Sequence, residues 1–328
     1  MNTTILSSGT INTTMLTSET SSITIFDYIN YVFLPVSVLL GVVGNSLTVL
    51  VMRTDRFSGS PFSCLLIVLA LSDLVALLSQ PFNKAFFIEL IGQDIRAIHD
   101  ITCKLYIVIR RTSKMMSSWM VVGLCLERFI AVWFPMKAKY LISKRLVLTF
   151  IISILVIIVS FNGAWSYASR VLDGQCNPDV YDHSDSNERL KFGLMLQMGT
   201  AIYSMVPIVI LIFLTTLIVV KLFKHQRWRR SLNSRPSSDN EGRITAMLIC
   251  IVIAYVILIL PITIIHNVAY QKHVHAYSEK SYKFSSFKEV AQWMEQLNYC
   301  LNFFLYVMTS KQFRQLLCNI VFKNSRVQ

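Results

Sequence analysis

Residues 244–270 read ITAMLICIVIAYVILILPITIIHNVAY, an apolar run that contains no Asp, Glu, Lys or Arg. A helix needs about 20 such residues to cross the hydrocarbon core of a bilayer, so this run predicts a transmembrane helix. Six further runs of comparable length occur in the chain. The seven runs lie at about Tyr28–Met52, Phe62–Phe82, Lys104–Phe134, Leu146–Trp165, Phe192–Val220, Ile244–Tyr270 and Val290–Met308.

The composition agrees with a membrane protein. Of 328 residues, 54% are hydrophobic and only 15% are charged, and the mean hydropathy is +0.53, which excludes an ordinary soluble protein. No soluble domain or internal repeat is found. The expected fold is all-α, a single seven-transmembrane-helix bundle over 27–309, with an N-terminal tail over 1–26 and an amphipathic helix and tail over 310–328.

The net charge of +13 is sorted along the chain rather than gathered in one patch, which argues against nucleic-acid binding. The loops after the first, third and fifth spans and the C-terminal tail hold 17 of the 31 Lys and Arg residues, and the N-terminal tail holds none. Cytoplasmic loops carry the excess of positive charge. The N-terminus is therefore expected outside the cell, with the protein in the plasma membrane.

The N-terminal tail supports this orientation. It lacks the basic start and apolar centre of a cleaved signal peptide, so the first span is expected to direct its own insertion. Asn2-Thr3-Thr4 and Asn12-Thr13-Thr14 are glycosylation sequons on the side expected to be extracellular, although such sequons also arise by chance.

Seven cysteines are present, and five of them fall within spans or on the expected cytoplasmic side, where disulfides are rare. Cys103 and Cys176 alone are expected outside and would pair, joining the top of the third span to the loop after the fourth; two free thiols are the alternative. Cys318 lies on the amphipathic C-terminal helix and is a palmitoylation candidate, with an unmodified thiol as the alternative.

Ionisable residues inside a membrane need a partner or a function. Asp73 lies near the middle of the second span, and Asn45, Ser117, Asn298 and Asn302 lie at comparable depths. Such a cluster could hold a small hard cation through oxygen ligands, or it could be a hydrated polar contact between helices with no ion. Both interpretations stay open at this stage.

Several short motifs together identify a family resemblance. They are GVVGN ending at Asn45, LALSDL with Asp73, Cys103 opening the third span and Glu127-Arg128-Phe129 closing it, Pro207, Pro261, and NFFLY from Asn302 to Tyr306. Their order and spacing resemble the rhodopsin family of G protein-coupled receptors over about Tyr28–Leu317, and the chain is most similar to the peptide-binding branch.

The resemblance implies roles for these residues. Glu127 and Arg128, with Asn302 and Tyr306, would control coupling to the G protein, whereas an ordinary interfacial ion pair is the alternative for Glu127 and Arg128. Pro207 and Pro261 would kink the fifth and sixth spans, because an interior proline removes a helix hydrogen bond. A sodium pocket would consist of Asp73, Ser117, Asn298 and Asn302.

The chain also departs from the family pattern. Phe303 stands where the family has a proline in the seventh span, Ile259 where it has a tryptophan in the sixth, and Thr215 where a tyrosine is common in the fifth. The fourth span lacks its usual tryptophan, and Phe129 replaces the tyrosine after Arg128. These differences indicate a divergent member with altered basal activity or weak signalling.

The ligand is predicted to present an anionic or strongly hydrogen-bond-accepting group to the third span. Arg110, Arg111 and Lys114 lie within about two turns of its outer end, and Arg110 shares a helix face with Lys114. The alternative is internal pairing, with Glu295 or Glu89 neutralising Arg110. These cations argue against an amine ligand. The expected pocket comprises Arg110, Arg111, Lys114, Glu89, Gln197, His266, Gln292 and Glu295.

The expected function is therefore that of a receptor for an extracellular peptide, with a small anionic or lipid mediator as the alternative ligand. Lys221–Arg235 and the C-terminal helix would contact a heterotrimeric G protein, or lipid headgroups. A non-signalling decoy receptor and a transporter are the alternative functions, although no inverted repeat or filter loop is found. No catalytic residues, no metal centre and no cofactor beyond an allosteric sodium ion are expected.

Overall fold

The computed structural model describes residues 13–55, 57, 59–81, 92–172, 174–177, 186–231, 240–271 and 282–323. Within these ranges the side chains of 13–28, 225–231, 240–244, 269–271 and 282–285, and of a few single residues, are not described. The glycosylation candidates Asn2 and Asn12, the pocket candidate Glu89 and most of the basic side chains of 221–235 lie outside the described part.

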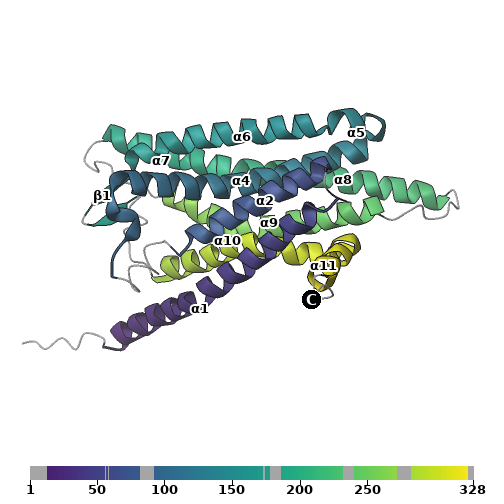
Figure 1. Ribbon diagram of the computed structural model, residues 1–328. Helices are drawn as coiled ribbons and strands as arrows, with labels where there is room; N and C mark the ends of the chain where they lie inside the picture. Colours follow the sequence, from purple (N-terminus) through teal and green to yellow (C-terminus); the bar gives the residue numbers. More distant parts are fainter. Residues whose placement is uncertain are drawn as a thin grey trace, which may run out of the picture.

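Long helices lie roughly side by side in one bundle, and a two-stranded hairpin lies at the opposite end from the short C-terminal helix (Figure 1). The main helices are α1 (Thr13–Met52), α2 (Pro61–Ser79), α4 (Asp100–Trp133), α6 (Lys144–Trp165), α7 (Ser186–Thr200), α8 (Val206–Ser231), α9 (Asn240–Gln271) and α10 (Tyr282–Thr309). Shorter elements are η1 (Ile95–Ile98), α5 (Pro135–Leu141), η2 (Ser166–Ala168), η3 (Ala201–Met205) and α11 (Lys311–Lys323). The antiparallel hairpin joins β1 (Arg170–Leu172) to β2 (Gln175–Asn177).

Six of the described helical segments are long and apolar enough to cross a membrane. They are Tyr31–Met52, Pro61–Ser79, Asp100–Trp133, Lys144–Trp165, Leu190–Lys224 and Thr245–Val268. The seventh long helix, α10, has 28 residues but places Glu295, Gln296, Asn298 and Asn302 in its buried face. Its polarity is therefore directed into the bundle, and the expected all-helical membrane bundle is confirmed.

Local sequence signals explain where the helices start. Pro61 opens α2 and Pro135 opens α5, because the first helical position needs no hydrogen-bond donor and suits the fixed φ of proline. The Ser143 hydroxyl caps α6 by accepting from the Leu146 amide. Ser310 does the same for α11 by accepting from the amide of Phe313.

The fifth crossing contains a wider turn. The segments α7, η3 and α8 form one continuous crossing, in which η3 is π-helical and the Val206 amide donates to the Ala201 carbonyl, five residues back. Pro207 follows directly and has no amide hydrogen to donate. The π-helical turn thus lies directly on the N-terminal side of Pro207, and the kink expected at Pro207 stays a prediction.

The central helix of the bundle is α4, which contacts α2, α6, α8 and α9. Its inner face contributes Met115, Met116, Met120 and Leu124 to the main hydrophobic core. Apolar side chains on outer faces are exposed instead, for example Leu39 of α1 at 65% and Val209 of α8 at 67%. In a membrane these faces meet lipid hydrocarbon, so their exposure costs little.

Candidate functional site

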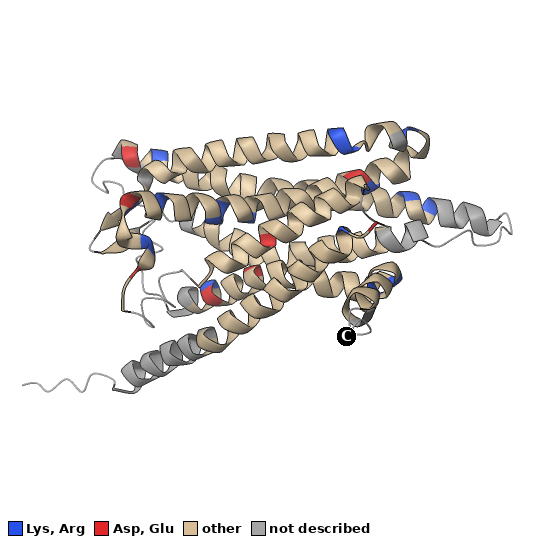
Figure 2. Ribbon diagram, in the orientation of Figure 1, with Lys and Arg blue, Asp and Glu red and all other residues tan. Residues whose placement is uncertain are grey.

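Charged side chains gather toward the two ends of the bundle and are sparse between them (Figure 2). Among the few in the interior are Asp73, Lys114 and Glu295, which come from three different helices. They belong to a series of polar contacts that begins under the β1–β2 hairpin and continues toward the end that carries α11. This series is the candidate functional site.

The ion pair between α4 and α10 is the first part of the site. Lys114 Nζ lies 2.8 Å from Glu295 Oε2, and the two side chains are 15% and 5% exposed. The other carboxylate oxygen, Glu295 Oε1, accepts hydrogen bonds from the hydroxyls of Tyr203 in η3 and Tyr299 in α10. These hydroxyls also lie 3.0 Å from each other. One carboxylate thus joins three membrane crossings.

The neighbouring cations Arg110, Arg111 and Lys114 of α4 have different surroundings. Arg110 donates to the hydroxyl of Tyr106 and to the side-chain amide oxygen of Gln80, both at 3.0 Å. Arg111 lies over the ring of Trp165, with its guanidinium carbon 3.7 Å from the ring centroid. Lys114 alone among them pairs with Glu295. The sequence suggested, as the alternative to ligand binding, an internal ion pair between Glu295 and Arg110. In the structure Glu295 pairs with Lys114, one turn further along α4.

The other residues predicted to line the pocket differ in how far they are buried. His266 of α9 is half-buried, and Gln292 of α10 is half-buried one turn before Glu295. Gln197 of α7 has an exposed side chain. Tyr203, Tyr299, Gln80 and Trp165 were missed by sequence reasoning, because tyrosine and tryptophan in apolar spans are indistinguishable from ordinary core residues.

The hairpin above the pocket is held by a disulfide between Cys103 and Cys176, whose Cα atoms lie 5.5 Å apart, which confirms the expected pairing. Two carboxylates hold it as well. Asp94 Oδ2 accepts from the Cys176 amide at 2.9 Å, and Asp100 Oδ1 accepts from the Val171 amide at 2.8 Å. Each strand therefore has its own carboxylate in addition to the covalent link.

Asp94 also forms an ion pair with Arg96, at 2.7 Å, and both side chains are buried. Burial would raise the pKa of Asp94, but hydrogen bonds from the Arg96 side chain and the Cys176 amide outweigh it and lower the pKa below its usual value. The guanidinium carbon of Arg96 lies 5.3 Å from the centroid of the Tyr106 ring. Tyr106 thereby contacts both Arg96 and Arg110.

The second part of the site is centred on Asp73, which is fully buried in α2. Its two carboxylate oxygens accept from the Ser117 hydroxyl at 2.5 Å and from the Asn302 side-chain amide at 2.7 Å. Asn298 is buried on the same helix as Asn302, whereas Asn45 donates to the backbone carbonyl of Tyr299. The structure thus brings Asp73, Ser117 and Asn302 into direct contact.

This cluster suits a small hard cation by the chemistry of its donors, because one carboxylate and neutral oxygen atoms meet in a buried place. Asp73, Ser117 and Asn302 would hold such an ion, and Asn298 stays a predicted further ligand. The described residues include no cluster of three or more His, Cys, Asp and Glu suited to a metal ion. Sodium binding here stays a prediction.

The third part of the site lies toward the α11 end. Arg128 Nε lies 2.7 Å from Glu127 Oε2, and the Arg128 guanidinium carbon lies 4.6 Å from the centroid of the Phe62 ring. Both charged side chains are mostly buried, at 13% and 10% exposure. The pair is therefore partly desolvated against α2 rather than held in open solvent.

Aromatic packing joins α10 to α11. Phe313 of α11 packs on Phe303 and on the buried Tyr306, with ring centroids 5.9 and 5.7 Å apart. Arg314 Nη1 donates to the carbonyls of Val307 and Met308, which would otherwise lack partners at the end of α10. Cys318, the palmitoylation candidate, has an exposed side chain on α11.

The three side chains that depart from the family pattern, Phe303, Ile259 and Thr215, all contact neighbouring helices or lie buried in the bundle. Phe303 lies against Gly44 of α1, and α10 continues through it without interruption. Ile259 of α9 is fully buried, just before Pro261 in the same unbroken helix, and Thr215 lies 3.6 Å from the Cys125 sulfur. At each of these three positions, the side chain that this chain carries fills its place in the bundle.

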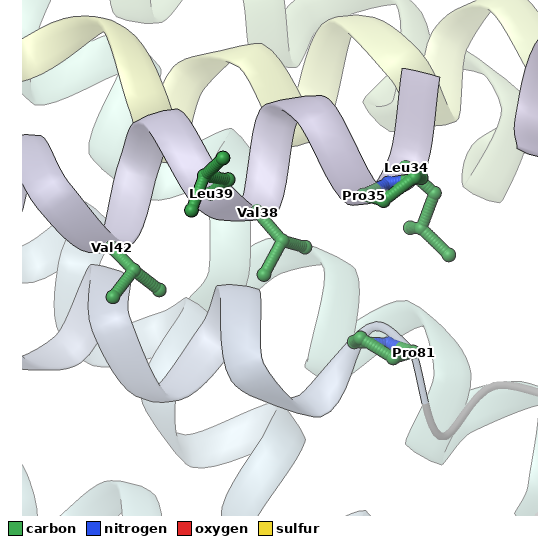
Figure 3. Close-up of a pocket in the computed structure, with 6 residues that line it drawn as sticks. All are labelled: Leu34, Pro35, Val38, Leu39, Val42 and Pro81. Atoms are coloured by element: carbon green, nitrogen blue, oxygen red, sulfur yellow. The ribbon is translucent and has the colours of Figure 1, made fainter. Parts of the chain in front are cut away.

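An apolar groove of about 280 Å³ lies elsewhere, between α1 and the end of α2. Figure 3 shows its lining residues, which are Leu34, Pro35, Val38, Leu39, Val42 and Pro81. All six are apolar, so the groove offers no hydrogen bond or charge to a polar ligand. None of the lining residues takes part in the polar contacts described above, so the groove is not part of the candidate site.

Comparisons with known proteins agree on one family. The family model described as 7 transmembrane receptor (rhodopsin family) matches residues 44–306. The growth hormone secretagogue receptors type 1 of Mustela putorius furo and Homo sapiens are each 27% identical over 300 residues, covering 88% of this chain and 76% of theirs. The cysteinyl leukotriene receptor 1 of Cavia porcellus is 21% identical over 289 residues, covering 86% and 81%.

Proposed function

Since this chain belongs to the rhodopsin family of seven-transmembrane receptors, a family without enzymatic activity, we propose that it binds an extracellular ligand at the plasma membrane and activates a heterotrimeric G protein. The proposed orientation places the N-terminus and the β1–β2 hairpin outside and α11 inside. The distribution of Lys and Arg among the loops supports this orientation.

The observation that carries the ligand proposal is the setting of Arg110. Within the described residues its hydrogen bonds go to two neutral groups, on Tyr106 and Gln80, and no carboxylate pairs with it. A guanidinium in a partly buried site gains most from a planar anion that accepts two hydrogen bonds. We therefore propose that the ligand carries an anionic group, which Arg110 receives first.

A peptide is the proposed ligand class, with a small anionic or lipid mediator as the alternative. The relatives are named for two different ligands, growth hormone secretagogue and cysteinyl leukotriene, and do not decide between these classes. A simple monoamine is disfavoured, because it would bring a further positive charge beside Arg110, Arg111 and Lys114.

Activation is proposed to be a shift in population between a resting and an active arrangement, to which a ligand contributes only through its different affinity for the two. Arg128 is held by Glu127 and Phe62 in the arrangement described here. In the active arrangement Arg128 would leave Glu127 and contact the G protein. Lys221, Lys224 and α11 would frame that contact.

The proposal is tested by screening peptide and carboxylate libraries on cells that express the chain, with calcium release through a promiscuous G protein as the signal. Cells that express Arg128→Ala at equal surface density are the control, because ligand binding should survive while the signal is lost. A ligand that binds the wild-type receptor without any nucleotide exchange on any G protein would favour the non-signalling alternative.

A further inference from the structure

The two oxygens of the Glu295 carboxylate have separate partners. Oε1 receives the hydroxyls of Tyr203 and Tyr299, and Oε2 receives the ammonium of Lys114. Lys114 could therefore leave Oε2 without disturbing the hydrogen bonds at Oε1. In a bidentate ion pair, by contrast, one cation binds both carboxylate oxygens, and its departure would leave both without a partner.

Lys114 is also the more accessible partner. Its side chain is 15% exposed against 5% for Glu295, so more of the lysine than of the carboxylate is within reach of another molecule. Arg110 lies on the same face of α4, one turn nearer the hairpin. An anion that enters beneath the hairpin would thus meet Arg110 before Lys114.

We propose that Lys114 is a carboxylate-exchange site, where a carboxylate of the extracellular ligand takes the place of Glu295 on the lysine ammonium while Tyr203 and Tyr299 retain Glu295. This inference rests on the proposed receptor function and deepens it by naming the ligand group as a carboxylate. The group could be an acidic group of a peptide or the carboxylate of a fatty-acid-like mediator.

Charge and hydrogen-bond capacity both allow the exchange. Arg110 and Lys114 carry two positive charges, and among the described residues Glu295 is the carboxylate that pairs with Lys114 while none pairs with Arg110, so a second carboxylate reduces the local excess of positive charge rather than creating a negative one. An ammonium has three N–H donors. The ligand carboxylate can therefore bind Lys114 before Glu295 leaves. Glu295 then loses its counter-charge and keeps the two tyrosine hydroxyls, so the contact between Lys114 and the ligand has to offset that loss.

The exchange would also affect the positions of the helices. In the structure Glu295 joins α10 to α4 through Lys114 and to η3 through Tyr203. After the exchange α10 would keep its link to η3 and lose its direct link to α4. The described part of α10 also carries Asn302, which holds Asp73 of α2, so the rearrangement would begin one to two turns from that cluster.

The experiment is a chemical rescue on the purified full-length receptor in lipid nanodiscs, measured as the unfolding temperature. Glu295→Ala removes the resident carboxylate and should lower the unfolding temperature. Sodium acetate at about 50 mM should restore roughly 1 °C relative to equal sodium chloride, as expected for a ligand near its dissociation constant. Glu295→Asp, which keeps the charge and shortens the side chain, should show a smaller rescue and serves if the alanine variant does not fold.

Two controls identify the site. Adding Lys114→Met to Glu295→Ala should abolish the rescue, because the ammonium that binds acetate is gone. Asp55→Ala, which removes an exposed carboxylate elsewhere, should show no response to acetate. N-acetylglycine and hexanoate then compare a peptide-like with a fatty-acid-like carboxylate, and the stronger rescue identifies the source.

Equal unfolding temperatures in acetate and chloride for both Glu295 variants would overturn the exchange site, as would a rescue that survives Lys114→Met. Because no G protein is present in this assay, such a failure would leave the proposed signalling function standing. Conversely, a rescue by acetate in a receptor that never promotes nucleotide exchange would support the exchange site and contradict the proposed signalling function.

Discussion

Phe303 of α10 lies directly against Gly44 of α1, so that a methyl group at residue 44 would come within 2.9 Å of the Phe303 Cβ atom. Phe303 occupies the position at which the family has a proline. Its ring also packs on Phe313 of α11 at 5.9 Å, so one side chain links the first helix, the seventh helix and the C-terminal helix. The position has become a packing centre instead of a kink.

The first prediction follows from this contact. Gly44→Ala should destabilise the receptor by about 1–3 kcal/mol, because extra volume in a filled contact forces the helices apart. Phe303→Ala in the same chain should recover only part of the loss, since the Phe303 Cβ atom remains. Gly163→Ala is the matched control, because no atom lies within 4 Å of its added methyl group, and it should not lower the unfolding temperature. Equal effects at both glycines would contradict the packing argument.

The second prediction concerns the ion pair beneath the hairpin. Asp94→Asn should cost about 3 kcal/mol, because it leaves the buried Arg96 without its counter-charge. The pKa of Asp94 is lowered in the folded protein, so its stabilisation is complete above the unfolded pKa of about 3.9 and is lost as the pH falls through the folded value. The difference in unfolding temperature between wild type and Asp94→Asn should therefore shrink below about pH 4. A constant difference down to pH 3 would argue against it.

The third prediction separates the roles of Arg110, Arg111 and Lys114 in α4. Once an agonist is known, Arg110→Gln and Lys114→Gln should each raise its half-maximal concentration roughly tenfold or more, about 1.4 kcal/mol. Arg111→Gln should instead lower the unfolding temperature, because Arg111 is stacked on Trp165. Dose–response curves and thermal unfolding of the same three variants decide the matter. Wild-type potency in both Arg110→Gln and Lys114→Gln, or full activity of a simple monoamine, would refute anion recognition.

The fourth prediction concerns Glu127 and Arg128. Glu127→Gln should raise basal nucleotide exchange several-fold, roughly 1 kcal/mol of population shift, because it weakens the partner that holds Arg128. Arg128→Ala should abolish stimulated exchange while leaving radioligand or fluorescent-ligand binding intact. Lys137→Ala, an exposed cation near the same end, is the control and should change neither. Normal signalling by Arg128→Ala at equal surface expression would exclude the proposed role.

Much of the fold could be predicted from the sequence, because the cost of exposing polar backbone to lipid leaves few structures for long apolar runs. The seventh helix was predicted from the run Val290–Met308, although Glu295, Gln296, Asn298 and Asn302 make its inner face polar and α10 is not among the six described helices apolar enough to cross a membrane. The disulfide could be predicted because only two cysteines were expected on the outer side. The cluster of Asp73, Ser117 and Asn302 could be anticipated, because each lies at a similar depth in its span.

The partner of Glu295 could not be predicted with the same success. Arg110 and Lys114 share a helix face and differ by only one turn, and the relative depth of two helices cannot be read from their sequences to that accuracy. Tyr203 could not be anticipated either, because its direction depends on the π-helical turn in which it lies. A hydrophobic pattern specifies which face of a helix is buried, but not which side chains on neighbouring helices form hydrogen bonds or ion pairs.

The π-helical turn at Ala201–Met205 has a consequence for comparing this chain with its relatives. A π-helical turn accommodates one more residue than an α-helical turn over the same length, so it rotates everything on one side of it by about 100° relative to a regular helix. A relative without the extra residue can be aligned through Pro207 or through Gln197, but not through both without a gap. Residue equivalences in the outer half of this crossing must therefore be counted from the hairpin side, and a single-residue deletion within 201–205 would turn the side chains of that half by about 100° while leaving the rest of the receptor in register.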